Sequence, residues 1–234
     1  MPPTTMPGRR SALLVDLDGT LTDPAEGIVG CFRLALETLG RAPPAAADLA
    51  WIIGPPLRQC FAEFLGTEGD PEAALEVYRS RYSTGGLFEA LVYDGVDDTL
   101  AELRAAGTRL FLCTAKPIVY AERILSHFNL ARHFERAYGD ELDGRFQEKA
   151  DLVARILREQ ALDPGDCCMW GDRKHDVLAA SRHAIPTIGA LWGYGGADEL
   201  RAAGAAALCA SPPEVPAAFW ALLGARSSWR APAR

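Results

Sequence analysis

Short hydrophobic runs recur along the chain and alternate with segments of helical periodicity. The runs have strand length and are rich in β-branched, aromatic and cysteine residues. They predict strands over residues 12–15, 109–113, 136–138, 167–170, 187–191 and 207–209. Amphipathic segments that predict helices lie between most of them, over 97–106, 118–128, 148–159 and 174–183. This alternation predicts an α/β fold, with a doubly wound parallel sheet covered by helices on both faces.

The interval from 23 to 93 departs from the alternation. It contains three segments of helical period, 26–39, 56–65 and 71–82, and no segment that we predict as a strand. We therefore predict a small all-helical domain over 23–93, inserted after the first strand of an α/β domain that comprises 11–22 and 94–224. Residues 1–10 and 225–234 carry proline and arginine without any period, which predicts flexible tails.

Composition places the chain among ordinary globular proteins and narrows its partners. Of its 234 residues, 49% are hydrophobic and 24% charged, and the net charge of −7 supplies no basic field for nucleic acid. The six cysteines show no zinc-site spacing, so we expect buried free thiols in a reducing compartment. No stretch approaches the roughly 18 apolar residues of a membrane span, and we expect a cytoplasmic protein that does not contact membranes.

Two aspartates follow the first predicted strand in the run Asp16-Leu17-Asp18-Gly19-Thr20. Residues two apart in a strand lie on one side, so both carboxylates can reach the same small volume. Their mutual repulsion would be relieved by a divalent cation such as Mg²⁺, which prefers oxygen ligands. The alternative is a simple turn after a strand, since Asp, Gly and Thr are all common in turns.

Polar residues also follow two later predicted strands, and ligands of open α/β sheets bind at such strand ends. Thr114 ends the second strand and Lys149 begins a later helix, so both can bind a phosphate. Asp172 can complete a cation's ligands, with Asp176 as support. The structural alternatives are a packed threonine, a solvated lysine and an aspartate that caps its helix.

Phosphoryl transfer through an aspartate would give these side chains unequal roles. Asp16 would attack phosphorus, and Asp18 would protonate the leaving oxygen and then deprotonate the hydrolytic water. Trp192 and Tyr194 lie in a glycine-rich loop after the fifth predicted strand, and we interpret both as packing residues.

In this order, Asp16-x-Asp18-Gly19-Thr20, Thr114, Lys149 and Gly171-Asp172-x-x-x-Asp176 resemble the four motifs of the haloacid dehalogenase superfamily. The helical insert makes the chain similar to its phosphoglycolate-phosphatase-like members. The resemblance implies a Mg²⁺-dependent phosphatase with a Rossmann-like core domain and a helical cap. It assigns Asp16 and Asp172 as metal ligands, together with the backbone carbonyl of Asp18, and Thr114 and Lys149 as phosphate binders. The second aspartate argues against a dehalogenase.

The substrate is expected to be a small phosphorylated metabolite chosen by the insert. We predict that Gly19, Thr20, Arg58, Ala115 and Lys116 bind it, with the two cations gripping a second negative charge, as in phosphoglycolate. A 5′-nucleotidase and a sugar-phosphate phosphatase or phosphomutase remain alternatives, and a non-catalytic protein that binds a phosphorylated ligand is a remote one. A monomer and a homodimer are equally compatible with the sequence.

Overall fold

The computed structural model describes residues 11–142 and 148–227 of the chain. Its main sheet has six strands in the order β5-β4-β1-β6-β7-β8, and all neighbouring strands are parallel. These strands are β1 (Ala12–Val15), β4 (Arg109–Pro117), β5 (Arg136–Asp140), β6 (Cys167–Gly171), β7 (Thr187–Ala190) and β8 (Ala207–Cys209). The order runs in opposite directions on the two sides of β1, which confirms the predicted doubly wound α/β class and makes the carboxyl end of β1 the topological switch point.

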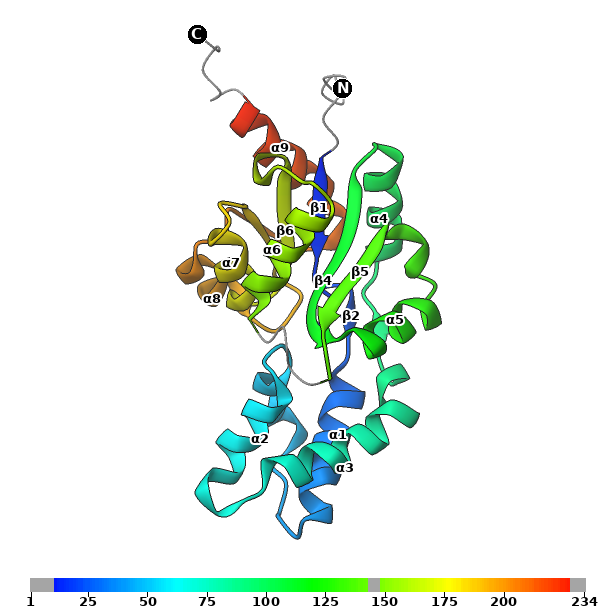
Figure 1. Cartoon of the computed structure of the whole chain (residues 1–234), viewed down its shortest axis with the longest axis vertical. Coiled ribbons are helices and arrows are strands. Elements are labelled where there is room, and N and C mark those ends of the chain that lie inside the picture. Colours follow the sequence, from blue (N-terminus) through cyan, green and yellow to red (C-terminus); the bar gives the residue numbers. More distant parts are fainter. Residues whose placement is uncertain (1–10, 143–147, 228–234) are drawn as a thin grey trace.

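Alternation along the strands divides the apolar residues between two cores. Leu13 and Val15 of β1 face one core and Ala12 and Leu14 the other. Side chains of α4 (Val96–Ala105), α5 (Ile118–His127) and α9 (Val215–Ser227) fill the first core, and those of α6 (Lys149–Glu159) and α7 (Lys174–Ser181) the second. A short helix, α8 (Gly196–Ala203), contacts α7. The sheet is therefore covered on both faces, as Figure 1 shows.

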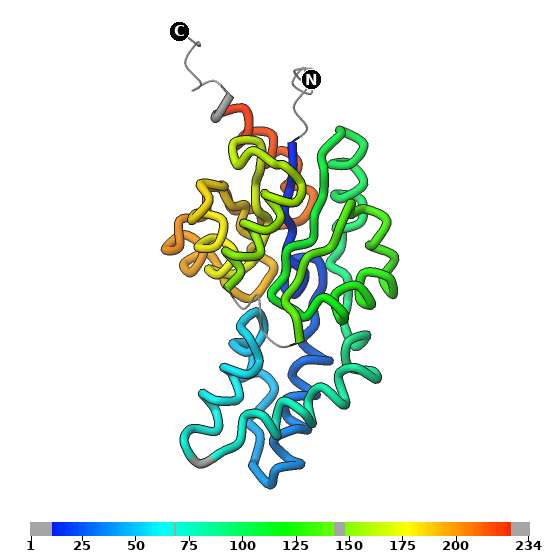
Figure 2. The backbone as a smooth tube through the Cα atoms, viewed as in Figure 1, coloured from blue at the N-terminus to red at the C-terminus, as the bar shows by residue number. Residues whose placement is uncertain are grey.

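A helical insert lies between β1 and β4 and packs below the carboxyl ends of the strands in Figure 1. Its helices are α1 (Ala25–Thr38), α2 (Leu57–Leu65) and α3 (Pro71–Thr84), with the 3₁₀ turns 46–52 and 66–68 between them and a third, 86–88, after α3. Asp70 starts α3 by accepting hydrogen bonds from the Glu72 and Ala73 amides. Phe32 and Phe61 stack with their ring centroids 4.2 Å apart and join α1 to α2. Figure 2 shows the insert as a distinct lobe along the tube.

The prediction that no strand lies between 23 and 93 was wrong. β2 (Thr22–Asp23) pairs antiparallel with β3 (Leu91–Val92), so a two-stranded ribbon ties the entrance of the insert to its exit. Strands of two residues are too short to show a period of two, which is why the sequence pattern missed them.

The terminal regions differ in part from the predicted tails. Helix α9 continues to Ser227 and so includes the first residues of the predicted tail over 225–234. The rest of that tail, and the one over 1–10, lie outside the described residues. All six cysteine side chains are buried, as predicted. Among the helices of the described part, none has the length and apolar character needed to cross a membrane.

Candidate active site

The loop after β1 brings Asp16 and Asp18 to the edge of the sheet. The Asp16 amide donates to the Trp170 carbonyl of β6 at 2.9 Å, which continues the strand pairing as far as the first aspartate. The chain then turns sharply at Gly19, whose φ is +84°. A Cβ at Gly19 would lie 2.1 Å from Oδ2 of Asp172, so glycine is required by this close approach as well as by the turn.

Lys149 joins two of the carboxylates. Its Nζ lies 2.8 Å from Oδ1 of Asp16 and also donates to Oδ1 of Asp176. The other oxygen of Asp176 accepts a hydrogen bond from the Arg173 amide at 3.0 Å, which orients it at the start of α7. Burial alone lowers the pKa of Lys149, but the carboxylates of Asp16 and Asp176 outweigh that effect and raise it above its ordinary value. Lys149 therefore stays charged beside Asp16.

Asp18 has a lysine of its own. Its Oδ2 lies 2.7 Å from Nζ of Lys116, while its Oδ1 is buried and has no hydrogen-bond partner among the described residues. Burial raises the pKa of Asp18 and the Asp16 carboxylate adds to that effect, whereas Lys116 opposes it. Each aspartate of the pair is thus held by a different lysine, and one oxygen of Asp18 is buried without a hydrogen-bond partner among the described residues.

Asp172, which directly follows β6, accepts hydrogen bonds from the loop after β7 and the loop after β1. Its Oδ2 accepts from the Tyr194 amide at 2.8 Å, and its Oδ1 accepts from the Thr20 hydroxyl at 3.3 Å. Burial raises the pKa of Asp172 well above its ordinary value, and the nearby Asp176 and Asp16 carboxylates raise it further. Asp172 does not cap α7, because Arg173 is the cap residue and Asp176 accepts its amide.

The loop after β7 supports the site in a way that the sequence interpretation missed. The Trp192 indole donates to the Thr20 carbonyl at 3.0 Å, and the Tyr194 hydroxyl donates to Asp23. Both residues pack against the hydrophobic core, as predicted, and their hydrogen bonds also tie this loop to the segment that follows Asp16. The sequence signals for this contact were two glycines of the loop: a Cβ at Gly193 would lie 2.3 Å from Cβ of Asp172 and 2.4 Å from the Gly19 carbonyl oxygen, and one at Gly195 would lie 2.2 Å from the Asp172 carbonyl oxygen.

A divalent cation fits this acidic group. Carboxylate oxygens of Asp16, Asp172 and Asp176 all lie within 4.8 Å of one another in a buried position. Hard oxygen donors at that spacing suit Mg²⁺, and a cation would relieve the repulsion that raises the pKa of Asp172. The side chain of Asp18 is not part of this group, so its predicted metal contact through the backbone carbonyl stays a prediction.

The other predicted site residues divide into those that line the cavity and those that do not. Thr114 and Ala115 of β4 line a cavity together with Asp16, Asp18 and both lysines. The Thr114 hydroxyl oxygen accepts from the Lys116 amide at 3.2 Å and keeps its own proton to donate.

Gly19 and Thr20 are turned inward. Their amides donate to the carbonyls of Thr22 and Leu17, and the Thr20 hydroxyl donates to Asp172. The structure does not bring these two to the cavity wall as far as the described residues define it.

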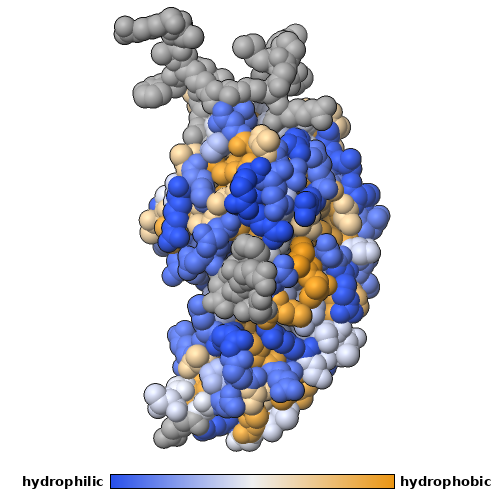
Figure 3. All heavy atoms as spheres, viewed as in Figure 1, coloured by the Kyte–Doolittle hydropathy of each residue, from blue (hydrophilic) through white to orange (hydrophobic). Residues whose placement is uncertain are grey.

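The cavity has a volume of about 330 Å³ and lies between the sheet edge and the insert. From the insert it is lined by the apolar and aromatic residues Ile28, Ile52, Pro55, Pro56, Leu57, Leu75, Tyr78 and Tyr82, and by the polar residues Arg58, Gln59 and Arg79. Hydrophobic side chains also gather on the surface at the junction of the two parts (Figure 3). The insert thus contributes rings and alkyl groups to one wall, opposite the charged strand ends.

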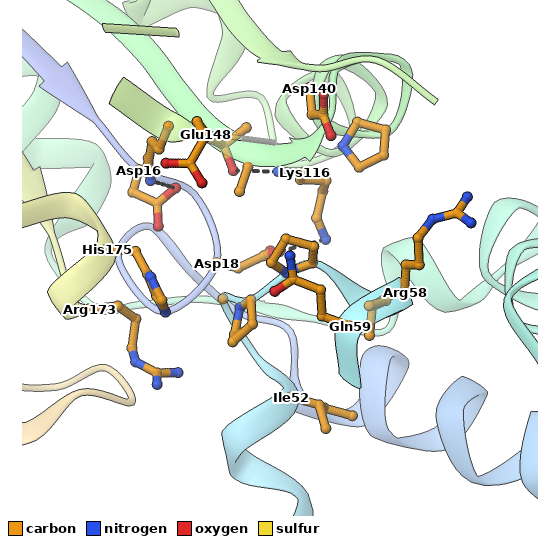
Figure 4. Close-up of a pocket in the computed structure, with 18 of the residues that line it drawn as sticks. Asp16, Asp18, Ile52, Arg58, Gln59, Lys116, Asp140, Glu148, Arg173 and His175 are labelled. Atoms are coloured by element: carbon orange, nitrogen blue, oxygen red, sulfur yellow. Dashed lines mark hydrogen bonds and ion pairs between the residues drawn. The ribbon is translucent and has the colours of Figure 1, made fainter. Parts of the chain in front are cut away.

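The arginines of this wall are already paired. Arg58 forms an ion pair with Glu72 of α3, and Figure 4 shows its guanidinium pointing away from Asp18. The other arginines that line the cavity also have acceptors: Arg79 the Leu142 carbonyl, Arg173 Glu199, and Arg182 Glu148. Lys116 is brought to Asp18, as predicted for a cation near the phosphate. Arg58, predicted to grip a second negative charge of the substrate, lines the cavity while paired with Glu72, and its contact with the substrate stays a prediction.

Comparisons with known proteins agree with this arrangement. The sequence profile of the haloacid dehalogenase-like hydrolases matches residues 13–190. A 5′-nucleotidase of Pseudomonas aeruginosa is 44% identical over 191 residues, 81% of this chain and 86% of that protein. The tyrosine-protein kinase PtkA of Mycobacterium tuberculosis is 43% identical over 194 residues, 82% of this chain, and the match spans 66% of its length.

A phosphoglycolate phosphatase of Psychrobacter arcticus is 29% identical over 203 residues, 82% of this chain and 88% of that protein. The crystal structure of a predicted phosphatase from Clostridium acetobutylicum superposes with a TM-score of 0.85 at 34% identity, over 91% of this chain and 99% of that one. The fold class and the resemblance inferred from the four motifs are therefore confirmed.

Proposed function

This chain belongs to the haloacid dehalogenase-like hydrolase family and is a phosphatase, and from that premise we propose that it hydrolyses a small phosphate monoester through an aspartyl phosphate on Asp16. The observation that carries the proposal is the arrangement of Asp16 and Asp18 on one cavity. Each is held by its own lysine, Asp16 by Lys149 and Asp18 by Lys116. A nucleophile and a proton carrier need this kind of separate anchoring.

The reaction takes two steps. In the first, a carboxylate oxygen of Asp16 bonds to phosphorus, the ester P–O bond breaks, and Asp18 gives its proton to the departing oxygen. In the second, a water oxygen attacks phosphorus while Asp18 takes the water proton, the bond between Asp16 and phosphorus breaks, and inorganic phosphate leaves. The carboxyl group of Asp18, which lines the cavity, carries the proton in both directions.

Phosphate binding falls to two further side chains. Lys149 offsets the negative charge that would otherwise keep a phosphate away from Asp16. The Thr114 hydroxyl, buried at the end of β4, donates to a phosphate oxygen. Both groups are held by the fold before a substrate arrives, so little reorganisation is needed in the reaction.

We assign Mg²⁺ to the carboxylates of Asp16 and Asp172 and the backbone carbonyl of Asp18. When bound, it would neutralise charge on the nonbridging phosphate oxygens. Asp176 is held by Lys149 and the Arg173 amide, so it orients Lys149 within the site. Dialysis against EDTA should abolish phosphate release and added MgCl₂ should restore it; full activity in EDTA would contradict the metal assignment.

Two substrate classes are candidates within this chemistry. The motifs and the insert favour a phosphoglycolate-like ester, and such a substrate needs a cation for its carboxylate. A 5′-nucleoside monophosphate is favoured by the cavity wall instead, because its rings and alkyl groups suit a nucleoside and Arg58 is paired with Glu72. The relative named a 5′-nucleotidase also has the higher identity of the two.

A panel of phosphate esters tests the proposal. Phosphoglycolate, AMP, TMP and glucose 6-phosphate are incubated with the protein and Mg²⁺, and kcat/KM is compared because discrimination appears in that ratio. Phosphate release no greater than that of Asp16→Asn would contradict the role of Asp16. Isomerised sugar phosphate would indicate a phosphomutase, and binding of esters without turnover would indicate a non-catalytic protein.

A further inference from the structure

One side chain of the insert contacts the reacting groups through a lysine. Tyr82 lies near the end of α3, and its hydroxyl accepts a hydrogen bond from Nζ of Lys116 at 2.5 Å. The same Nζ lies 2.7 Å from Oδ2 of Asp18. A continuous chain of polar contacts therefore runs from the insert through β4 to the carboxyl group of Asp18.

The Lys116 ammonium depends on these contacts because it is buried. Its side chain is only 6% exposed, and a buried ammonium is stable only when acceptors surround it. Asp18 and the Tyr82 hydroxyl supply two acceptors, and the face of the Tyr82 ring lies 4.8 Å from Nζ and adds a cation–π contact. Without the hydroxyl, one N–H of the ammonium would have to find another partner.

Tyr82 is itself held on both sides. It stacks on Tyr78 of the same helix with ring centroids 5.1 Å apart, and it meets the edge of Tyr120 of α5 at 5.6 Å. The residue is 2% exposed. Because α3 belongs to the insert and α5 to the α/β domain, its position depends on both parts being packed together.

We propose that Tyr82 is a positioning residue that holds Lys116 against Oδ2 of Asp18, so that the carboxyl group of Asp18 keeps the orientation needed to protonate the leaving oxygen of the substrate. Among the described residues the carboxyl group of Asp18 contacts no hydrogen-bond donor other than Lys116, so the orientation of that group follows the orientation of the lysine. The proposal rests on the proposed function, in which Asp18 protonates the leaving group. It adds that a residue of the insert, and not the sheet edge alone, sets the geometry of proton transfer.

The leaving group provides a test that a purely structural role would fail. Phenolate is the stronger base of the two leaving groups and depends more on receiving a proton as it departs, whereas p-nitrophenolate depends on it less. Phenyl phosphate and p-nitrophenyl phosphate differ by one nitro group at the far end of the ring, and comparing the ratio of their kcat/KM values between variant and wild type cancels the effect of that group on binding. A misplaced Asp18 should therefore slow the first ester and leave the second almost unchanged.

The variant to make is Tyr82→Phe, which keeps the ring and removes the hydroxyl. We expect kcat/KM for phenyl phosphate to fall about 10-fold and that for p-nitrophenyl phosphate to change less than about 2-fold. Tyr138→Phe is the matched control, because it removes a buried tyrosine hydroxyl that contacts Glu159 and Gln160 on the opposite face of the sheet. In that control the ratio of the two kcat/KM values should equal the wild-type ratio.

Equal losses for both esters, or no loss for either, would overturn the positioning role of Tyr82. Thermal unfolding of each variant shows whether it is folded, and Tyr82→Leu, which also removes the ring, should give at least as large a change in the ratio. Failure of the proposed function looks different: the wild-type protein would then release no more phosphate from either ester than Asp16→Asn does.

Discussion

The sheet edge and the helical insert line the same cavity but contribute largely different kinds of side chain. By the sheet edge we mean the carboxyl ends of β1, β4 and β6, the residues that directly follow them, and the start of α6. At the sheet edge, charged groups contact one another: Asp16 pairs with Lys149 and Asp18 with Lys116. In the insert, rings and alkyl groups make up most of the residues on the cavity, and the polar residues among them are Gln59, Arg79 and Arg58, the last of which pairs with Glu72. The sheet edge therefore supplies reactivity, and the insert supplies a surface for the rest of the substrate.

This difference predicts which substitutions should lower the rate of turnover and which should change the preference among substrates. Buried, mutually paired charges tolerate little change, because removing one partner leaves another without compensation. Apolar walls discriminate less sharply, since one methylene in such a pocket is worth only about 1–3 kcal/mol. We expect substitutions at the sheet edge to lower turnover of every substrate, and substitutions in the insert to alter the order of substrates.

The largest effect should come from Asp16→Asn. The amide cannot form the phosphorylated intermediate, so kcat should fall by about 10⁴-fold or more for every ester. The amide oxygen can still accept from Lys149, so the variant should fold. Phosphate release measures the loss of turnover, and a thermal unfolding curve shows whether the variant is folded. Turnover within about 10-fold of wild type would mean that Asp16 is not the nucleophile, and the contrast between the two regions would be lost.

Lys149→Met should cost both rate and stability. It leaves the buried carboxylates of Asp16 and Asp176 without their common cation, and breaking such a group costs about 3–5 kcal/mol in the free energy of unfolding. We also expect kcat to fall by about 10²- to 10³-fold, since a charge that binds the phosphate is lost. Urea unfolding measures the first effect.

The control for that substitution is Lys174→Met, which alters an exposed lysine at the start of α7. Its effect on unfolding should stay within about 0.5 kcal/mol. If the two lysine variants behave alike, the charged contacts at the sheet edge do not stabilise the site as we infer.

A pair of glycine substitutions sharpens the comparison further. In Gly193→Ala the new Cβ would press on Asp172 and on the Gly19 carbonyl, so one of these loops must move. Misplacement by a fraction of an ångström should lower kcat/KM by about 10- to 100-fold. Gly30→Ala in α1 of the insert meets no atom within 4 Å, and it should raise stability by about 0.4–1 kcal/mol without changing activity. Similar activity in the two variants would show that the loop around Gly193 is adaptable.

Sequence patterns predicted the sheet edge well because its geometry follows from topology. Once the strand order is doubly wound, residues that directly follow β1 and β6 must meet, and this places Asp16 near Asp172 whatever the details of packing. Lys149 was placed correctly for the same reason, since it begins the helix that packs beside α7.

The contacts of the insert could not be predicted in that way. Tyr82 meets Lys116, 34 residues away, only because of how α3 packs against the α/β domain, and no local pattern records that orientation. Arg58 lines the cavity and forms an ion pair with Glu72 of the neighbouring helix, a contact that no local pattern records, so its predicted contact with the substrate stays a prediction. Tyr194 reaches Asp172 through a backbone amide, which carries no residue-type signal.

Arg58→Ala should have the smallest effect and is the most direct test of the insert's role. The Arg58 side chain is 42% exposed and its partner Glu72 58%, so their ion pair should contribute less than about 1 kcal/mol to stability. Because the guanidinium points away from Asp18, we expect kcat/KM for AMP and for phosphoglycolate to change less than about 2-fold. Glu72→Gln is the matched variant, since it releases the same arginine without removing it. If Arg58→Ala instead lowers kcat/KM for phosphoglycolate alone, and Glu72→Gln raises it, then the insert does offer a cation to the substrate. In that case the division between a charged sheet edge and an apolar insert fails at this residue.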